Sequence, residues 1–208
     1  MPPSPDARPH DYPHDRPYDA VLLAGGRARR LGGADKPGAA VGGRPLISWV
    51  AAAVAGAARL VVVGPPRAAD PPGAIVVRED PPGAGPVPAL RAGLAEARAP
   101  RTVLLAADLP FLRPAHVAAL LDAADAPGAG GAVLVDEDGR EQWLAGCWPT
   151  AGLRASLASY EGGSLRGLLG PLDPARVALP AGERPPWYDC DTPGALLHAD
   201  RLAVPYDR

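Results

Sequence analysis

Residues 19–36 of the chain read Asp-Ala-Val-Leu-Leu-Ala-Gly-Gly-Arg-Ala-Arg-Arg-Leu-Gly-Gly-Ala-Asp-Lys. The run Asp19–Leu23 is short and almost continuously apolar, which is typical of a parallel strand covered on both faces. A glycine-rich loop follows it directly. Because open α/β sheets bind their ligands at the carboxyl ends of their strands, this stretch predicts an α/β fold and also where a ligand would bind.

Short apolar segments alternate with amphipathic ones along the first half of the chain. After the first strand, further strands are expected at Leu60–Val63, Ile75–Val77 and Thr102–Ala106. Helices are expected at Pro45–Ala57, Pro88–Ala97 and Pro114–Ala124. Each of these helices opens with a proline, which the first helical turn tolerates. The alternation predicts a single doubly wound, mostly parallel, Rossmann-like sheet with right-handed crossovers.

The second half of the chain has a different pattern. Residues 137–140 read Glu-Asp-Gly-Arg, a turn sequence, so the flanking runs Ala132–Asp136 and Gln142–Trp148 predict an antiparallel hairpin inserted in this half. Thr192 and Pro193 are suited to open a last helix that ends near residue 202. The other elements expected here are two helices and a strand, at Ala151–Tyr160, Ser164–Leu169 and Arg176–Leu179.

Composition sets the domain organisation and excludes several classes of protein. Residues 1–18 are rich in proline and lack apolar periodicity, so we expect a disordered tail, followed by one domain over residues 19–208. A net charge of −2 gives no basic surface for nucleic acid. No apolar run approaches the length of a membrane span, and no signal peptide pattern precedes the first strand. These features predict a cytoplasmic protein.

The loop after the first strand combines glycine pairs with positive charge. Its backbone N–H groups can approach an anion without hindrance from side chains. Its cations are Arg27, Arg29, Arg30 and Lys36. Lys36 is the only lysine among 21 cationic residues, which indicates a position where a compact ammonium is needed, unless it is there by chance. A polyphosphate is the natural ligand for such a loop; the alternative is a surface loop with solvated arginines.

The pattern Leu-Ala-Gly-Gly-x3-Arg-Leu-Gly-Gly-x-Asp-Lys, residues 23–36, resembles the signature loop of the molybdenum cofactor guanylyltransferases, a branch of the nucleotidyltransferase superfamily. The resemblance implies that the loop wraps a nucleoside triphosphate. It places phosphate contacts on Arg30 and Lys36. It also assigns backbone contacts to Leu23, Ala24, Gly25 and Gly26.

Two carboxylates are candidates for a Mg²⁺ site, since Mg²⁺ bound to phosphates usually takes one or two from the protein. Asp108 follows an apolar strand and so lies at the same sheet edge as the loop; the family has an aspartate at this strand end. Asp191, in the run Asp-Cys-Asp-Thr-Pro at 189–193, either binds the metal or favours the N-terminus of the last helix. The family often has asparagines at 189 and 191, whereas aspartates are more usual in cytidylyl-transferring relatives.

The remaining candidates concern the nucleotide and the acceptor. Asp80 ends a strand, and the resemblance gives it a nucleotide-binding role, against the alternative of a solvated carboxylate. Gly64 stands where the family often has asparagine. On the acceptor side, Trp143 either stacks on a pterin ring or packs in the core, and Arg166 either holds the acceptor phosphate or is an exposed helical residue.

The resemblance therefore implies an enzyme that transfers GMP from GTP to the terminal phosphate of molybdopterin, with pyrophosphate as the second product. Lys36, Arg30 and Asp108 would be catalytic, and Mg²⁺ held by Asp108 and Asp191 would be the cofactor. Expected partners are the two substrates and, transiently, molybdoenzymes or other cofactor-assembly proteins, with neither nucleic acid nor membrane. The alternatives are CTP or another phosphate acceptor as substrate, or a noncatalytic nucleotide-binding protein that handles the cofactor.

Overall fold

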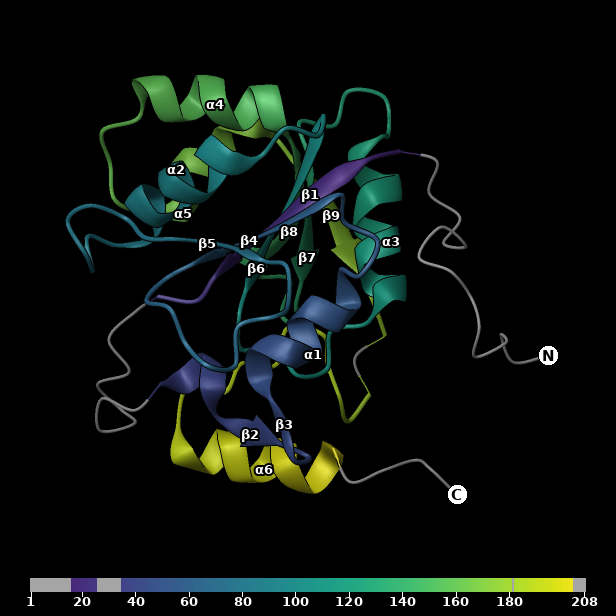
Figure 1. Cartoon of the computed structure of the whole chain (residues 1–208). Helices are drawn as coiled ribbons and strands as arrows, with labels where there is room; N and C mark the ends of the chain where they lie inside the picture. The colour runs from purple at the N-terminus through teal and green to yellow at the C-terminus, as the bar shows by residue number, and fades with distance from the viewer. Residues whose placement is uncertain (1–15, 26–34, 181, 204–208) are drawn as a thin grey trace.

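The computed structural model describes residues 16–25, 35–180 and 182–203. Its main feature is a seven-stranded sheet in the order β5-β4-β1-β6-β8-β7-β9 (Figure 1). All strands run in one direction except β8, which is antiparallel to both of its neighbours. The strands are β1 (Tyr18–Leu23), β4 (Arg59–Val63), β5 (Ile75–Val77), β6 (Arg101–Ala106), β7 (Ala132–Val135), β8 (Glu141–Pro149) and β9 (Ala175–Ala178). The prediction of a mostly parallel α/β sheet is confirmed.

Helices cover both faces of the sheet, and β1, an interior strand, is apolar on both of its faces. Ala20 and Leu22 of β1 belong to the core under α1 (Leu46–Ala53) and α3 (Pro114–Ala124). The intervening Val21 and Leu23 belong to the core on the opposite face. The helices that pack there are α2 (Pro86–Glu96), α4 (Thr150–Ser159) and α5 (Leu165–Leu169). Figure 1 shows these three helices together on one side of the sheet.

Helix α2 lies close to the sheet at Gly93. A Cβ atom at this position would lie 2.5 Å from Cγ1 of Val21 and 2.8 Å from Cγ2 of Val63. The absence of a side chain at residue 93 therefore lets the helix approach β1 and β4 closely.

The observed elements follow the expected ones with shifts at their ends. Helix α1 is the largest difference: it spans Leu46–Ala53 rather than Pro45–Ala57, because Pro45 is its N-cap and the chain leaves the helix at Val54, ahead of Gly56. Helix α2 begins two residues before the expected Pro88. Strand β1 begins at Tyr18, which is buried. Arg16 and Pro17 of the expected tail are exposed, and its residues 1–15 lie outside the described residues.

The hairpin of the second half is confirmed, but it is part of the main sheet. Strand β8 pairs with β7 and also with β6, where Leu104 faces Gly146. Strand β8 thus joins the parallel strands of the first half of the chain to β7 and β9. A short 3₁₀ helix, η3 (Gly170–Leu172), precedes β9.

A small subassembly that the sequence did not predict packs beside the sheet. It contains a 3₁₀ helix, η2 (Lys36–Gly38), and a two-stranded hairpin of β2 (Ala40–Val41) and β3 (Arg44–Pro45). The last helix, α6 (Pro193–Ala203), lies against this hairpin (Figure 1). Its start is capped as expected, since Oγ1 of Thr192 accepts a hydrogen bond from the N–H of Ala195 at 3.1 Å. Among the described residues no helix is both long enough and apolar enough to cross a membrane.

Candidate active site

The candidate site lies where four parallel strands end together. Leu23 of β1 is paired with Val63 of β4 on one side and with Ala106 of β6 on the other. Val63 in turn is paired with Val77 of β5. The loops that follow these strands therefore leave the sheet at one edge, and they carry most of the residues that the sequence singled out.

Three of the predicted residues meet at this edge. The ammonium of Lys36 forms ion pairs with Oδ2 of Asp108 and with Oδ1 of Asp191. The side chains of Lys36 and Asp108 are 16% and 13% exposed, whereas that of Asp191 is 52% exposed. The structure thus brings together a lysine and two carboxylates that are far apart in the sequence.

Each member of the cluster is held by its own element. Lys36 begins η2, and Asp108 follows β6, where the N–H of Ala107 donates to the carbonyl of Leu23 at 3.2 Å. Asp191 stands just before α6, next to the fully buried Cys190. Cys190 packs in a small apolar core whose other buried members are Val41, Leu46, Phe111 and Ala199. Packing of α6 against the β2–β3 hairpin thus places the carboxylate of Asp191 at the sheet edge.

The charges of the cluster are strongly coupled. Burial alone would lower the pKa of Lys36, but the charge of Asp108, with hydrogen bonds to Asp108 and Asp191, raises it above its usual value. Burial and the neighbouring carboxylates of Asp191 and Asp108 raise the pKa of Asp189. The cluster therefore holds its lysine charged and concentrates carboxylates that favour a further cation.

The donor set fits a magnesium ion that completes its coordination with substrate and water. In the described part of the chain, no three His, Cys, Asp or Glu side chains are grouped as an all-protein metal site. Asp108 and Asp191 nevertheless both reach one cation, the ammonium of Lys36. Carboxylate oxygens are the ligands that Mg²⁺ takes from proteins, usually only one or two when phosphates supply others.

The glycine-rich loop begins beside this cluster. The N–H of Ala24 donates to the carbonyl of Val63 at 2.8 Å, which continues the sheet by one residue past Leu23. Gly25 follows, and a Cβ atom there would lie 3.7 Å from the carbonyl oxygen of Val63. Two of the predicted nucleotide contacts, Gly26 and Arg30, lie outside the described residues.

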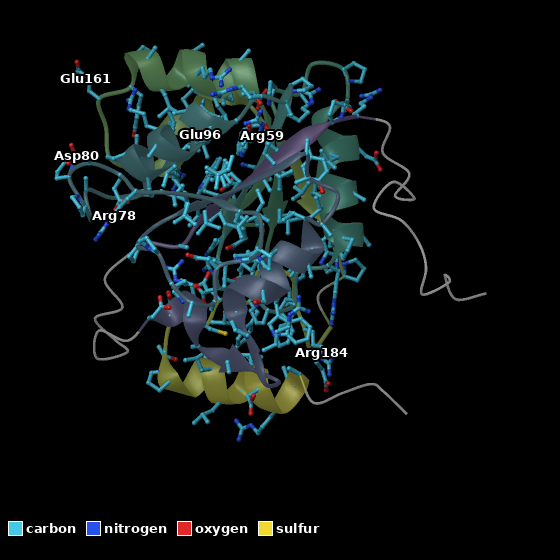
Figure 2. All side chains as sticks on the ribbon, viewed as in Figure 1. Arg59, Arg78, Asp80, Glu96, Glu161 and Arg184 are labelled. Carbon is cyan, nitrogen blue, oxygen red and sulfur yellow. The ribbon has the colours of Figure 1, made fainter. Side chains whose placement is uncertain are left out.

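At the end of β5 the structure distinguishes two adjacent carboxylates. Asp80 is exposed, and Figure 2 shows it at the outer edge of its loop, pointing away from the body of the protein. Glu79 is only 6% exposed. Its Oε1 accepts from the N–H of Gly83 at 2.8 Å, and a Cβ atom at Gly25 would lie 3.7 Å from that oxygen. Glu79, rather than Asp80, therefore faces the start of the glycine-rich loop.

Glu79 was missed, and strand periodicity held no signal for it. Ile75 and Val77 pack against the core under α2, but Val76 packs against the core on the opposite face. Both faces of β5 are covered, so alternation along the strand does not distinguish Glu79 from Asp80. A second missed residue, Arg67, binds both described ends of the glycine-rich loop and is considered below.

The two candidates for acceptor contacts lie on other elements. Trp143 of β8 packs against the fully buried Trp148, with ring centroids 6.4 Å apart and planes inclined by 19°. It is only partly buried, so part of its surface faces outward. Arg166 is exposed on α5.

Comparisons with known proteins identify the family of the chain. The family model of the MobA-like NTP transferase domain matches residues 20–177. A molybdenum cofactor guanylyltransferase of Bradyrhizobium sp. (strain ORS 278) is 35% identical over 200 residues, which cover 90% of this chain and 94% of that protein. Its counterpart in Burkholderia vietnamiensis (strain G4 / LMG 22486) is 38% identical over 179 residues, or 81% of this chain and 80% of that protein.

Solved structures share the fold. Molybdopterin-guanine dinucleotide biosynthesis protein A from Archaeoglobus fulgidus superposes with a TM-score of 0.71 at 18% identity, covering 89% of this chain and 98% of that one. A 2-C-methyl-D-erythritol 4-phosphate cytidylyltransferase from Thermus thermophilus gives a TM-score of 0.67 at 26% identity, with the same coverage. The chain therefore belongs to the MobA-like NTP transferase family, as one of its molybdenum cofactor guanylyltransferases.

Proposed function

We propose that this guanylyltransferase joins GMP from GTP to the terminal phosphate of molybdopterin. An oxygen of that phosphate attacks the α-phosphorus of GTP, a new phosphoanhydride bond forms, and the bond to the bridging oxygen breaks, so that pyrophosphate leaves. The observation that carries the proposal is the position of Lys36. It lies between Asp108 and Asp191, at the sheet edge where the glycine-rich loop begins.

The attacking phosphate is already an anion near neutral pH, so the reaction needs no protein base and no covalent intermediate. Catalysis then depends on positioning the two phosphates and on neutralising their charge. Lys36 and Arg30 would supply positive charge to the triphosphate. Backbone N–H groups of the loop, which starts at Leu23 and continues through Gly25 and Gly26, would donate hydrogen bonds to it.

Mg²⁺ is the proposed cofactor, held by Asp108 and Asp191. Once bound, the ion would neutralise charge on the transferring and leaving oxygens. The two carboxylates would hold the positive charge of Mg²⁺ beside the phosphates. The ammonium of Lys36, which both carboxylates contact, offsets part of their negative charge. Asp80 stays a proposed nucleotide contact.

The reaction product has to reach an enzyme that uses it. We therefore propose transient contact with molybdoenzymes or with other proteins of cofactor assembly. The cytoplasm is the proposed compartment, where GTP is available.

The test is pyrophosphate release with molybdenum-loaded molybdopterin as acceptor, with GTP and CTP assayed in parallel. We expect release with GTP, and loss of that release when a chelator removes Mg²⁺. Release with CTP alone would contradict the assignment of guanine and would make the Asp-Cys-Asp-Thr-Pro segment the better guide to the base. Tight binding of GTP without release of pyrophosphate would contradict the assignment of an enzyme acting on this acceptor.

A further inference from the structure

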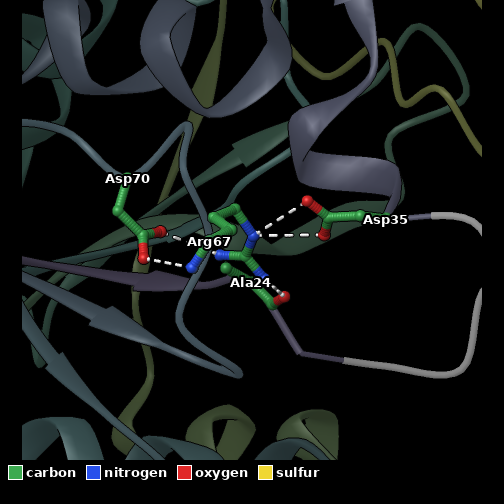
Figure 3. Close-up of polar contacts among 4 residues, drawn as sticks. All are labelled: Ala24, Asp35, Arg67 and Asp70. Carbon is green, nitrogen blue, oxygen red and sulfur yellow. Dashed lines mark hydrogen bonds and ion pairs between the residues drawn. The ribbon is translucent and has the colours of Figure 1, made fainter.

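Arg67, in the connection between β4 and β5, contacts both described ends of the glycine-rich loop, which we call the nucleotide loop (residues 24–35). Its Nη2 donates to the carbonyl of Ala24 at 2.9 Å. Its Nε donates to Oδ1 and Oδ2 of Asp35 at 3.1 and 3.2 Å. Figure 3 shows the guanidinium between these two residues. One side chain thus joins the point where the loop leaves β1 to the point where it enters η2.

The guanidinium is itself held in one orientation. Nη1 of Arg67 donates to Oδ1 of Asp70 at 3.1 Å, and Oδ2 of Asp70 accepts from the backbone N–H of Arg67 at 2.8 Å (Figure 3). The side chain of Arg67 is only 5% exposed, and that of Asp70 is 12% exposed. Solvent screening is therefore weak here, and charge-assisted bonds of this kind are stronger than neutral ones.

The bond to Ala24 fixes the plane of the Ala24–Gly25 peptide. In a trans peptide the carbonyl and the following N–H point in opposite directions. With the carbonyl of Ala24 held by Arg67, the N–H of Gly25 must point away from the guanidinium. Gly64 also lies against this peptide, because a Cβ atom there would be 2.9 Å from the carbonyl carbon and oxygen of Ala24. The direction of the first glycine N–H in the loop is thus set from outside the loop.

The hydrogen bonds from Arg67 to Asp35 hold the other end of the nucleotide loop. Asp35 directly precedes Lys36, the first residue of η2, whose ammonium contacts Asp108 and Asp191. Holding the carboxylate of Asp35 therefore fixes the backbone from which the Lys36 side chain extends. A lysine at position 67 would present all of its donors from one nitrogen and could not reach three separate partners as the Nε, Nη1 and Nη2 of the guanidinium do.

We propose that Arg67 is a positioning residue that fastens both ends of the nucleotide loop and so orients the Gly25 N–H and the Lys36 ammonium toward the triphosphate of the nucleotide. The inference rests on the proposed function, because it takes a nucleoside triphosphate as the ligand of this loop. It assigns Arg67 no contact with the reacting atoms.

The test compares Arg67→Lys with Arg59→Lys, a matched control. Arg59 is exposed at the opposite end of β4 (Figure 2). We expect Arg67→Lys to lower kcat modestly, because the Lys36 ammonium is less well placed, and to raise KM for GTP about tenfold, since a loop that grips the triphosphate binds ground state and transition state alike. The affinity for GTP with Mg²⁺ but without acceptor should fall by the same factor. Arg59→Lys should leave both values unchanged.

A second variant separates positioning from folding. Asp35→Asn removes the charge of a half-exposed partner and should preserve the fold. It should raise KM for GTP in the wild-type background and have no further effect in Arg67→Lys, as expected of two residues that act through one contact. A merely structural loss would lower the amount of active enzyme, and therefore the apparent kcat, without moving KM.

The outcomes distinguish the inference from the function on which it rests. If the wild type uses GTP and Arg67→Lys and Asp35→Asn leave KM unchanged, the positioning role is overturned while the guanylyltransferase assignment stands. Should Arg67→Lys fail to fold, an unchanged KM in Asp35→Asn overturns the role by itself. A wild type that neither binds nor turns over GTP overturns both.

Discussion

Lys36 and Asp191, which lie 155 positions apart in the chain, form an ion pair at the carboxyl edge of the sheet. The same ammonium also pairs with Asp108. The only lysine of the protein thus sits where two carboxylates converge, and a chain that otherwise uses arginine for positive charge keeps an ammonium at this position. The ammonium brings both carboxylates to a single nitrogen, whereas a guanidinium would spread the two contacts over different nitrogens.

Lys36→Arg tests this point. The charge is retained, but the larger guanidinium cannot contact Asp108 and Asp191 in the same geometry, so we expect turnover to fall about 100-fold, a loss typical of removing one stabilising donor. Pyrophosphate release measures the effect, and a thermal melt checks the fold. Wild-type rates in this variant would mean that the lone lysine is incidental.

Asp108→Ala should abolish turnover with little change in stability. The substitution removes a carboxylate from the proposed metal site, for which we expect a loss of about 1,000-fold or more. Lys36 keeps its pairing with Asp191, so the cluster retains one of its contacts. Glu96→Ala, at the end of α2 away from the site, is the control (Figure 2). Full activity of Asp108→Ala would contradict the metal assignment.

Glu79→Gln and Asp80→Asn together test which carboxylate at the end of β5 serves the nucleotide. We expect Glu79→Gln to weaken GTP binding about tenfold, since it alters a buried, charge-assisted hydrogen bond to Gly83 beside Gly25. Asp80→Asn should have the smaller effect, because its side chain is exposed and screened by solvent. Calorimetric titration with GTP gives both affinities. A larger loss in Asp80→Asn would support the nucleotide-binding role that the sequence assigns to Asp80.

A pH-dependent contribution to stability is expected at Asp125, the C-cap of α3. Burial raises its pKa, but the hydrogen bond and charge of Arg101, together with the charge of Arg16, outweigh this and lower it below 3.8. The carboxylate therefore stabilises the fold at neutral pH, and this contribution is lost as the pH falls through the lowered pKa.

Asp125→Asn should reduce the free energy of unfolding by about 0.5–1 kcal/mol at pH 7, the range of partly exposed ion pairs. Urea denaturation at pH 7 and near pH 3 measures the difference between variant and wild type. The difference should shrink at the lower pH; an equal difference at both values would show that the carboxylate's charge is not what stabilises the protein.

Local patterns predicted most of the fold and part of the site. The apolar run that becomes β1, the glycine-rich loop after it and Asp108 at the end of β6 are all neighbours of a strand end in the sequence. Their meeting follows from one rule, that parallel strands end at a common edge. The N-cap formed by Thr192 could also be predicted from local sequence, because its hydrogen bond joins residues only three positions apart.

The features that were missed depend on contacts distant in sequence. Nothing near Arg67 in the chain indicates that its partners are Ala24 and Asp35. The place of β8 between β6 and β7 is a matter of strand order, which local periodicity does not encode. The inward position of Glu79 could not be predicted either, because residues on both faces of β5 pack in the core and its partner, the N–H of Gly83, lies in the following loop.

The docking of α6 has a consequence for how the protein is made. Asp191 follows all of the strands in chain order, whereas the nucleotide loop and Lys36 come soon after the first. A chain still emerging from the ribosome thus contains Lys36 and Asp108 long before Asp191, the third member of the cluster, is synthesised. The enzyme acquires its complete charge cluster only at the end of its synthesis, so unfinished or prematurely terminated chains would lack it.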